Sequence, residues 1–467
     1  MGVYFSAQQR LAADPRYGRW RQDVATLLGL ADRCLERGRV DAALRWFDKA
    51  LRVSYDPSLH QAGRSPLAAD PAEFLRPLRE SATGTLMLGR TVPFSSAPSR
   101  PAPRDRRGGE PLRLLVIAQE NWTFVRPLID ALRATGRFEV RELDVEDLPE
   151  GGFPDRDRII RGRYDLVTSG RRMPTPPALA ESYDWADVAL VEWSHHVLTW
   201  ITLLDRAPRA LMSRVHRFEA FTPFTLLHDH ARIDRMLYVS PPVWNMLTVI
   251  APDFADIQAE HVGNLLARGL ETPPREDHDP RLLVQVGWVR EVKDVLFTIE
   301  VLERLRRHDD AYRLRLVGPR LPDSASRDTP YQRLVRERLE QLGPGPVEQL
   351  GARADVPALL AESGMIVSSS RHEGTHESVM EALAVGCPAV IRDWPDTVPY
   401  GGAASLYDPD WVVPDVDGAV QRILELRDPE VYAAASRLSR EFAFAQRDPS
   451  VVTAGYERAL QPPPRIS

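Results

Sequence analysis

The chain has 467 residues, of which 43% are hydrophobic and 27% charged, and its formal net charge is −6. That length exceeds one ordinary hydrophobic core, so two or three globular domains are expected. An acidic balance offers no strong positive field to attract phosphates, which argues against nucleic acid as a partner.

Further absences in the sequence narrow the class of protein. Cys34 and Cys387 are the only cysteines and lie far apart, so neither a disulfide framework nor a thiolate zinc site is expected. The histidine clusters, such as His195–His196, show no repeated metal-ligand spacing. No apolar leader core and no run of about 18 apolar residues is visible. We therefore expect a cytoplasmic protein without a bound metal.

Arginine replaces lysine almost throughout the chain. Of the 60 basic residues, only Lys49 and Lys293 are lysines. This bias reflects genome composition rather than physics, but a compact ammonium group differs from a planar guanidinium fork. A lysine at a basic position is therefore a candidate functional residue.

Residues 1–90 are expected to form a helical extension. Between about 20 and 57, small and apolar residues such as Leu27, Gly38, Ala43 and Phe47 have nearly the spacing of one tetratricopeptide-type helical hairpin. No second copy is visible, and a lone repeat cannot bury both its faces. The hairpin is either an ordinary one packed on the main body or a module for partners, including a homodimer through these helices.

A first α/β unit is expected at residues 112–262. Residues 91–111 before it are rich in Pro, Ser, Gly and Arg, the composition of a linker. Strand-like runs alternate with helical or loop segments, including a helix at Phe124–Ala134, and this predicts a parallel sheet covered on both faces. The expected strands are Leu112–Ala118, Phe138–Val145, Asp165–Thr168, Val188–Glu192, Ala210–Val215 and Arg235–Ser240.

A second α/β unit is expected at residues 263–445, with a C-terminal helix or tail at 446–467. After a turn-rich break at 269–280 the alternation restarts, with a helix at Val295–Arg307. The expected strands are Leu282–Gly287, Leu314–Gly318, Val347–Leu350, Met365–Ser370 and Ala389–Ile391. Two doubly wound units in tandem usually bind their ligand in a cleft between them, at the carboxyl ends of the strands.

The most informative segment surrounds Glu373. An apolar run predicts a buried strand, a turn containing Glu373 and Gly374 follows, and the next apolar run predicts a helix carrying Glu381. A helix N-terminus after such a turn favours anions, because unpaired N–H groups and the helix dipole point at one spot. Two flanking carboxylates can accept hydrogen bonds from hydroxyl groups. This combination suits a ligand that is both phosphate and sugar, namely a nucleotide sugar.

Two other strand ends of the second unit carry candidate binding residues. Gly287 is followed by Arg290 and Lys293 before a helix, so two cations can point toward the carboxyl edge of the sheet. A solvated loop would explain an arginine there, but the rare lysine favours a phosphate-binding role. Gly351, close to Arg353, lets a flat base approach the backbone.

In this arrangement the chain resembles the family 4 glycosyltransferases, over roughly residues 112–445. The most specific element is the Glu-x7-Glu motif, from Glu373 to Glu381. The run from Gly287 to Lys293 is similar to the family's phosphate-binding loop, and His216 sits where members carry a first-domain histidine facing the cleft. Within the family, the chain looks closest to bacterial enzymes that build surface polysaccharides or glycoconjugates.

The resemblance implies an α/β protein of the GT-B fold, with two Rossmann-like domains facing a cleft and the helical extension in addition. It implies a retaining glycosyltransferase that uses a nucleotide-diphospho-sugar, without metal or other cofactor, for hexosyl or N-acetylhexosaminyl transfer. The acceptor would be a glycan, a lipid-linked glycan or a small molecule. With a glycolipid acceptor, peripheral association with a membrane is also expected.

The same resemblance implies roles for individual residues. Glu373 would hold the hydroxyls of the donor sugar, and Glu381 the ribose hydroxyls. Lys293 and Arg290, in the loop that begins at Gly287, would neutralise the leaving diphosphate. The remaining expected contacts come from Gly374 and Thr375, whose N–H groups would face the sugar and diphosphate, from Arg353, and from His216, which would reach the reacting centre.

Several positions depart from the family pattern. Many members have an arginine directly after the glycine of the phosphate loop, where this chain has Trp288, and Arg290 is the candidate to replace it. The loop Gln119–Thr123 lacks the double glycine common in members, so acceptor binding is expected to differ. Glu192–Trp193, at the end of another first-domain strand, is either structural or part of the acceptor site. His216 is either a hydrogen-bonded structural histidine or a residue that reaches the sugar or the reacting centre.

Two other functions fit the sequence. One is a non-catalytic GT-B subunit that scaffolds a partner through the helical extension, which Trp288 favours and the set Glu373, Glu381 and Lys293 disfavours. The other is a sugar-nucleotide epimerase, which would need an acid/base pair where only one candidate histidine is visible.

Overall fold

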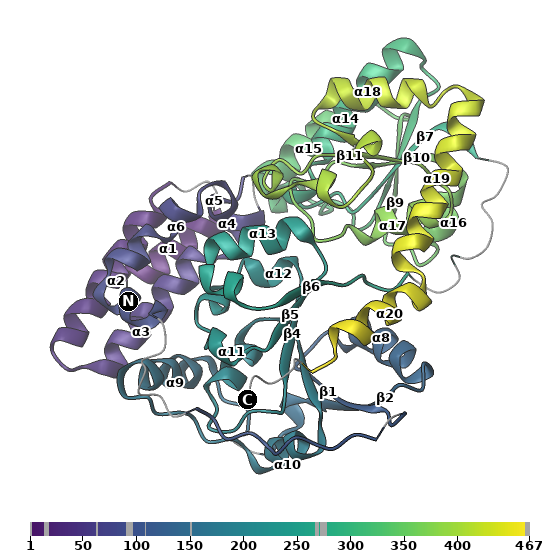
Figure 1. The fold of residues 1–467 in the computed structure, drawn as a ribbon. Coiled ribbons are helices and arrows are strands. Elements are labelled where there is room, and N and C mark those ends of the chain that lie inside the picture. The colour runs from purple at the N-terminus through teal and green to yellow at the C-terminus, as the bar shows by residue number, and fades with distance from the viewer. Residues whose placement is uncertain are drawn as a thin grey trace. The chain divides into compact units, whose positions relative to one another are not determined.

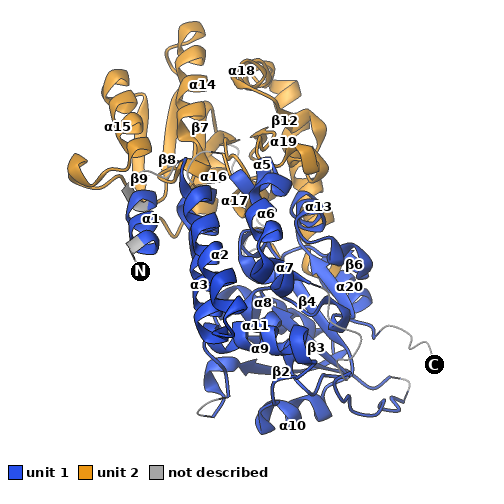
Figure 2. Ribbon diagram, turned by 90° about the vertical axis from the view of Figure 1, so that its left-hand side faces the viewer, with its two compact units in different colours: residues 1–60, 66–264, 452–467 blue, residues 61–65, 265–451 orange. Residues whose placement is uncertain are grey.

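The computed structural model describes residues 2–13, 18–61, 64–89, 97–107, 109–149, 152–266, 270 and 278–462. They form two compact units, coloured separately in Figure 2. Unit 1 comprises residues 1–60, 66–264 and 452–467, and unit 2 comprises residues 61–65 and 265–451. Part of the expected linker (91–96 and 108), most of the expected break at 269–280 and tail residues 463–467 lie outside the described residues.

The N-terminal part of unit 1 is helical, as predicted. Helices α2 and α3 form the expected hairpin, and Gly38 makes the turn between them with a φ of 66°. Phe47 and Leu27 are among the side chains buried in it. The helices of this part are α1 (Gly2–Ala13), α2 (Trp20–Glu36), α3 (Val40–Ser54), α4 (Pro57–Gln61), α5 (Pro66–Ala69), α6 (Pro71–Glu80) and α7 (Ala82–Leu88).

The rest of unit 1 is built on a six-stranded parallel sheet with strand order β2-β1-β3-β4-β5-β6. Figure 1 shows this sheet with β1, β2, β4, β5 and β6 labelled. The strands are β1 (Leu112–Ala118), β2 (Phe138–Asp144), β3 (Val188–Glu192), β4 (Leu211–Val215), β5 (Arg235–Tyr238) and β6 (Ala259–His261). The helices are α8 (Trp122–Ala134), α9 (Arg156–Ser169), α10 (Pro177–Trp185), α11 (His196–Leu203), α12 (Arg217–Ala220), α13 (Pro241–Ile250) and α20 (Pro449–Ala459). Every residue of β3 and β4 is buried, as expected for central strands of a parallel sheet.

One predicted strand is wrong. Asp165–Thr168 lies in the last turns of α9 rather than in the sheet. The helix begins after Asp155, whose side chain accepts a hydrogen bond from the N–H of Arg158 at 2.9 Å, and it ends at Gly170, which has a φ of 71°. Its buried residues recur at helical spacing, which a four-residue window around Leu166 does not reveal.

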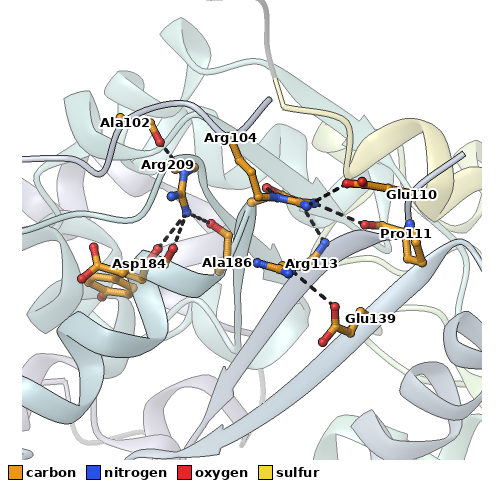
Figure 3. Close-up of polar contacts among 11 residues, drawn as sticks. Ala102, Arg104, Glu110, Pro111, Arg113, Glu139, Asp184, Ala186 and Arg209 are labelled. Carbon is orange, nitrogen blue, oxygen red and sulfur yellow. Dashed lines mark hydrogen bonds and ion pairs between the residues drawn. The ribbon is translucent and has the colours of Figure 1, made fainter. Parts of the chain in front are cut away.

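The described part of the expected linker lies along unit 1 and is fixed by arginines (Figure 3). Arg104 Nη2 lies 2.6 Å from Asp187 Oδ2, and Arg104 also contacts Glu110. Arg209 Nε donates to the carbonyl of Ala102 at 2.6 Å. Because the same Arg209 also donates to the carbonyl of Ala186, it joins this segment to the end of α10 and the approach to β3.

The sheet of unit 2 is also parallel and six-stranded, with strand order β12-β11-β10-β7-β8-β9. The strands are β7 (Asp279–Val286), β8 (Arg313–Val317), β9 (Val347–Gly351), β10 (Ser363–Ser368), β11 (Ala389–Arg392) and β12 (Val412–Val413). The helices are α14 (Val295–His308), α15 (Pro330–Leu342), α16 (Val356–Glu362), α17 (Glu377–Ala384), α18 (Val416–Glu425) and α19 (Pro429–Arg447). Two parallel sheets with surrounding helices were predicted, and both are confirmed.

Helices cover both faces of this second sheet. Successive strand residues point to opposite sides, so Leu283 belongs to the core under α14, α15 and α18, whereas Val284 belongs to the core under α16 and α17. Met365 and Ile366 of β10 divide in the same way. This double covering explains the continuous apolar runs and leaves the strand ends as the exposed positions for polar residues.

None of the described helices combines the length and the apolar character that crossing a bilayer requires.

Candidate functional site

The candidate site of unit 2 lies where the chain reverses its direction of strand addition. From β7 the chain adds β8 and β9 on one side, and then returns to place β10 on the other side of β7. The loops after β7 and β10 therefore diverge at the carboxyl edge of the sheet, which is where open α/β sheets bind ligands. Lys293 lies in the first loop and Glu373 in the second.

These two residues form a close ion pair. Lys293 Nζ lies 2.6 Å from Glu373 Oε1, and the hydroxyl of Ser370 donates to the same oxygen at 2.7 Å. The Lys293 side chain is 23% exposed and that of Glu373 is 10% exposed. The two loops that the sequence indicated thus meet, although 80 residues separate their charged groups.

His376 completes this cluster, and sequence reasoning assigned it no role. Its Nε2 lies 3.3 Å from Lys293 Nζ, and its Nδ1 lies 2.7 Å from the hydroxyl of Ser368. His376 is buried and stands at the N-cap of α17 with a φ of 43°. A residue with a β-carbon costs about 1–2 kcal/mol in this left-handed region. Nothing in the sequence indicates left-handed backbone at His376, because non-glycine residues adopt this conformation only where tertiary contacts require it.

A second group of charged side chains also connects these two loops. Asp294, the N-cap of α14, lies 2.6 Å from Arg392 and 4.0 Å from Arg371. Arg371 also pairs with the buried Asp396 at 3.2 Å, and its N–H donates to the carbonyl of Val292 at 2.8 Å. These contacts hold the segment before Glu373 against the segment around Lys293.

Gly287 and Gln285 fix the loop that carries the lysine. Gly287 has a φ of +74°, and a β-carbon there would lie 3.2 Å from Lys293 Cε. The buried Gln285 side chain donates to the carbonyls of Gly287 at 3.2 Å and Lys293 at 3.1 Å. Glycine therefore suits the left-handed backbone at this position, and a β-carbon would crowd the lysine stem.

The residue after this glycine belongs to the core. Trp288 is 1% exposed within the cluster under α14, and its indole N–H has no acceptor among the described residues. Trp288 therefore does not face a ligand at the carboxyl edge. Arg290, by contrast, is exposed.

Helix α17 supplies the remaining expected residues of this edge. Glu381 lies in its second turn, and burial together with the neighbouring Glu377 raises the pKa of Glu381. The hydroxyl of Thr375 donates to Glu377, and Tyr407 donates to the carbonyl of Thr375. Gly374 links Glu373 to this fixed turn.

Arg353 is not brought to the Lys293 cluster. Its Nε and Nη2 donate to Asp355 at 2.8 and 2.6 Å, so the loop after β9 engages its guanidinium group. Gly351 has a φ of 75° and accepts a hydrogen bond from the N–H of Gly318 at 2.9 Å. At Gly351, the end of β9, the chain presents its backbone, because glycine has no side chain.

His216 lies in unit 1, directly after β4. Its ring contacts that of Trp193, with 4.5 Å between ring centroids, and its Nδ1 lies 3.5 Å from Glu219 Oε1. Burial alone would raise the pKa of Glu219, but the nearby His216 side chain brings that pKa below its ordinary value. The other Glu219 oxygen accepts the backbone N–H of His216 at 3.2 Å, so one buried carboxylate fixes both the backbone and the ring.

Glu192 is part of the interior of unit 1. It is fully buried and lies 2.9 Å from Arg214 Nε. Arg214 also donates to the hydroxyl of Tyr456, so this pair anchors α20 to the sheet. The other Glu192 oxygen, Oε1, is buried and has no hydrogen-bond partner among the described residues.

The chemistry available at unit 2 is that of an anion and hydroxyl site. Lys293 offers a positive charge, α17 offers N-terminal N–H groups, and Glu373 and Glu381 offer acceptors. Across the described part of the chain, no three His, Cys, Asp or Glu side chains are grouped as metal ligands.

Comparison with known proteins agrees with this geometry. Residues 280–428 match the family described as "Glycosyl transferases group 1", and this stretch contains Lys293, Glu373 and Glu381. The similarity to this family is thus confined to unit 2. No curated protein matches the chain by sequence.

Solved structures show the fold of the whole chain. HepE from Anabaena, in complex with UDP, is 14% identical with a TM-score of 0.54, and the match covers 75% of this chain and 99% of HepE. A mutant of the O-GlcNAc transferase of Thermobaculum terrenum is 15% identical with a TM-score of 0.53, and the match covers 98% of this chain and 86% of that one. The two sheets with their helices are therefore those of the GT-B fold, as predicted, with the N-terminal helices in addition.

The chain spans little more than half of some other matched proteins. The match to TarM is 13% identical, covers 59% of this chain and 54% of TarM, and has a TM-score of 0.45.

Proposed function

We propose that the protein is a retaining glycosyltransferase that moves a hexosyl or N-acetylhexosaminyl group from a nucleotide-diphospho-sugar to an acceptor. The observation that carries this proposal is the Lys293–Glu373 pair at 2.6 Å, set at the strand reversal in the unit that is similar to the glycosyltransferase group 1 family. A cation beside a carboxylate suits a ligand in which a diphosphate is bonded to a sugar. HepE was solved in complex with UDP, so uridine diphosphate sugars are the first donors to test.

Unit 2 holds the donor in this proposal. Lys293 neutralises the leaving diphosphate, with help from the exposed Arg290 in place of the buried Trp288. Glu373 binds hydroxyls of the sugar, and Glu381 binds those of the ribose. Stabilising the charge that develops on the leaving group is the main catalytic effect, and it needs preorganised partners such as this pair.

Further donor contacts come from backbone groups. Gly374 and Thr375 present N–H groups to the sugar and diphosphate. The strand end at Gly351 receives the flat base, and Arg353 contacts the nucleotide only if it leaves Asp355.

His216 acts on the sugar or at the reacting centre in this proposal. The buried Glu219 fixes its ring, and Trp193 covers one ring face. The acceptor is a glycan, a lipid-linked glycan or a small molecule. We further propose that the reaction needs no metal ion, that it takes place in the cytoplasm, and that a lipid-linked acceptor brings the protein to a membrane surface.

The test is donor hydrolysis and transfer with UDP-, GDP-, ADP- and dTDP-sugars. We expect wild type to turn over at least one donor, and Glu373→Ala and Lys293→Ala to lower kcat by about 100-fold, since each removes a charge partner of the transition state. Lys49→Ala is the matched control, because Lys49 is the other lysine and packs on Trp46 in the N-terminal helices.

Full activity of both folded site variants would contradict the site assignment. Conversion of the donor without any acceptor into an epimer would favour the epimerase alternative. A wild-type protein that binds none of these nucleotides would favour the scaffold, which the buried Trp288 at the phosphate loop supports.

A further inference from the structure

The backbone conformation and contacts of His376 have no role in the proposed function. It is one of the described non-glycine residues with positive φ, at 43°, together with Asn121, Trp193 and Asp294. Asp294 follows Lys293 directly, so two of these strained positions flank the same ammonium group. Strained backbone at a site persists only where the surrounding contacts favour it, and it clusters where geometry serves function.

The hydrogen bonds of His376 fix which ring nitrogen carries the proton. An ammonium group has three donors and no acceptor, so Nε2 must accept from Lys293 at 3.3 Å. The neutral ring then carries its proton on Nδ1, which donates to the hydroxyl of Ser368 at 2.7 Å. Ser368 is the last residue of β10 and is fully buried, so the ring is anchored to the sheet itself.

Two acceptors therefore orient the lysine. Among the described residues, Glu373 takes one N–H of Lys293 at 2.6 Å and His376 takes another at 3.3 Å. An ammonium group held by two rigid acceptors has its third N–H in a fixed direction. With the carboxylate alone, the flexible lysine side chain could move around its single acceptor, whereas the second acceptor restrains the position of Nζ.

We propose that His376 is a positioning residue for Lys293, which it aims at the diphosphate of the donor as a neutral imidazole with its proton on Nδ1. This inference rests on the proposed function for the identity of the diphosphate. His376 acts through Lys293 and not on the sugar. Its ring, rather than the backbone at position 376, is what the site requires.

A double-mutant cycle tests this coupling. His376→Asn keeps a residue that tolerates left-handed backbone but has no ring to bridge Ser368 and Lys293. We expect it to lower kcat for donor turnover at least tenfold, with a change in KM below threefold. In a Lys293→Met background the same substitution should change kcat less than twofold, because the group that His376 positions is gone. His278→Asn is the matched control in unit 2, since His278 precedes β7 and stacks on Tyr432 at 4.3 Å, and it should keep wild-type kcat.

Nitrogen-15 NMR of the unliganded protein gives a readout that does not depend on activity. We expect the His376 resonances to show a protonated Nδ1 and an unprotonated Nε2, and the Nε2 resonance to move in Lys293→Met.

A proton on Nε2 overturns the inference. A kcat of His376→Asn within twofold of wild type, or an undiminished effect of this substitution in the Lys293→Met background, overturns it as well. If wild type binds no nucleoside diphosphate, the proposed function and this inference fail together; if wild type turns over donor and His376→Asn does so equally, only this inference fails.

Discussion

At the scale of single residues, replacing Glu381 is expected to raise stability and to lower nucleotide affinity. Burial and the neighbouring Glu377 raise its pKa, so the folded state favours the protonated form. The stability that this preference contributes is fully present below the ordinary pKa of 4.5 and is lost as the pH rises through the folded value. We therefore expect Glu381→Gln to raise the urea midpoint at pH 7.5, with the gain shrinking toward pH 4.5, while nucleotide affinity falls about tenfold through loss of a charged acceptor.

Urea titrations at the two pH values and calorimetry with UDP measure both effects. Glu340→Gln, at an exposed glutamate of α15, is the control and should change neither. A Glu381 variant that loses stability at pH 7.5 would contradict the raised pKa of Glu381, and one that binds nucleotide like wild type would contradict its place at the ribose.

The sequence indicated that Lys293 and Glu373 lie together in the candidate site, and it missed their neighbours for a physical reason. Lys293 and Glu373 could be found because each follows an apolar strand run, and the carboxyl ends of parallel strands meet at one edge. His376 and Asp294 could not, because left-handed backbone at a residue with a β-carbon depends on contacts from distant segments. Glu192 was a candidate from its strand end, yet its pairing with Arg214 is visible only in the folded protein.

At the scale of elements, the loop between β7 and α14 depends on Gly287. We expect Gly287→Ala to lower stability by about 1–2 kcal/mol through its left-handed backbone, and also to weaken nucleotide binding, because the new methyl group would lie 3.2 Å from Lys293 Cε. Gly136→Ala is the matched control, since Gly136 has a φ of +68° with no atom within 4 Å of the added carbon. Equal losses of stability with weaker UDP binding in Gly287→Ala alone would support the account, whereas equal binding by both variants would contradict it.

Most elements could be predicted because buried strands of a parallel sheet are continuous apolar runs. The expected Leu112–Ala118 and Val188–Glu192 coincide with β1 and β3. The error at Asp165–Thr168 arose because a short apolar run has the same appearance in a strand and in a buried helix, and only the caps at Asp155 and Gly170 distinguish them. The two-residue strand β12 is too short to leave a pattern.

At the scale of the whole molecule, buried histidines predict acid sensitivity of unit 1. Burial lowers the pKa of His60 to about 4 and of His230 to about 4, from an ordinary value of 6.5. Their neutral forms stabilise the fold fully above pH 6.5, and this stability is lost as the pH falls toward 4. Burial likewise lowers the pKa values of other histidines of unit 1, namely His195, His196 and His228.

For His60 and for His230 we expect a fall of about 2 kcal/mol each in the free energy of unfolding between pH 7.5 and 5, measured by urea titration. His60→Gln keeps a donor for the carbonyl of Ser54, which His60 Nε2 contacts at 3.1 Å, but cannot titrate. It should therefore lose less stability than wild type over this range. An equal loss in both proteins would show that His60 does not contribute to the acid sensitivity.

The most direct test of the central claim is calorimetric titration of UDP into wild type, Lys293→Ala and Lys49→Ala. If a nucleoside diphosphate is held by the Lys293–Glu373 edge of unit 2, wild type and Lys49→Ala will bind it equally. Lys293→Ala will then bind about 10- to 100-fold more weakly, the effect of losing one hydrogen bond to a charged group. Equal binding by all three proteins, or weaker binding by Lys49→Ala alone, would contradict the account.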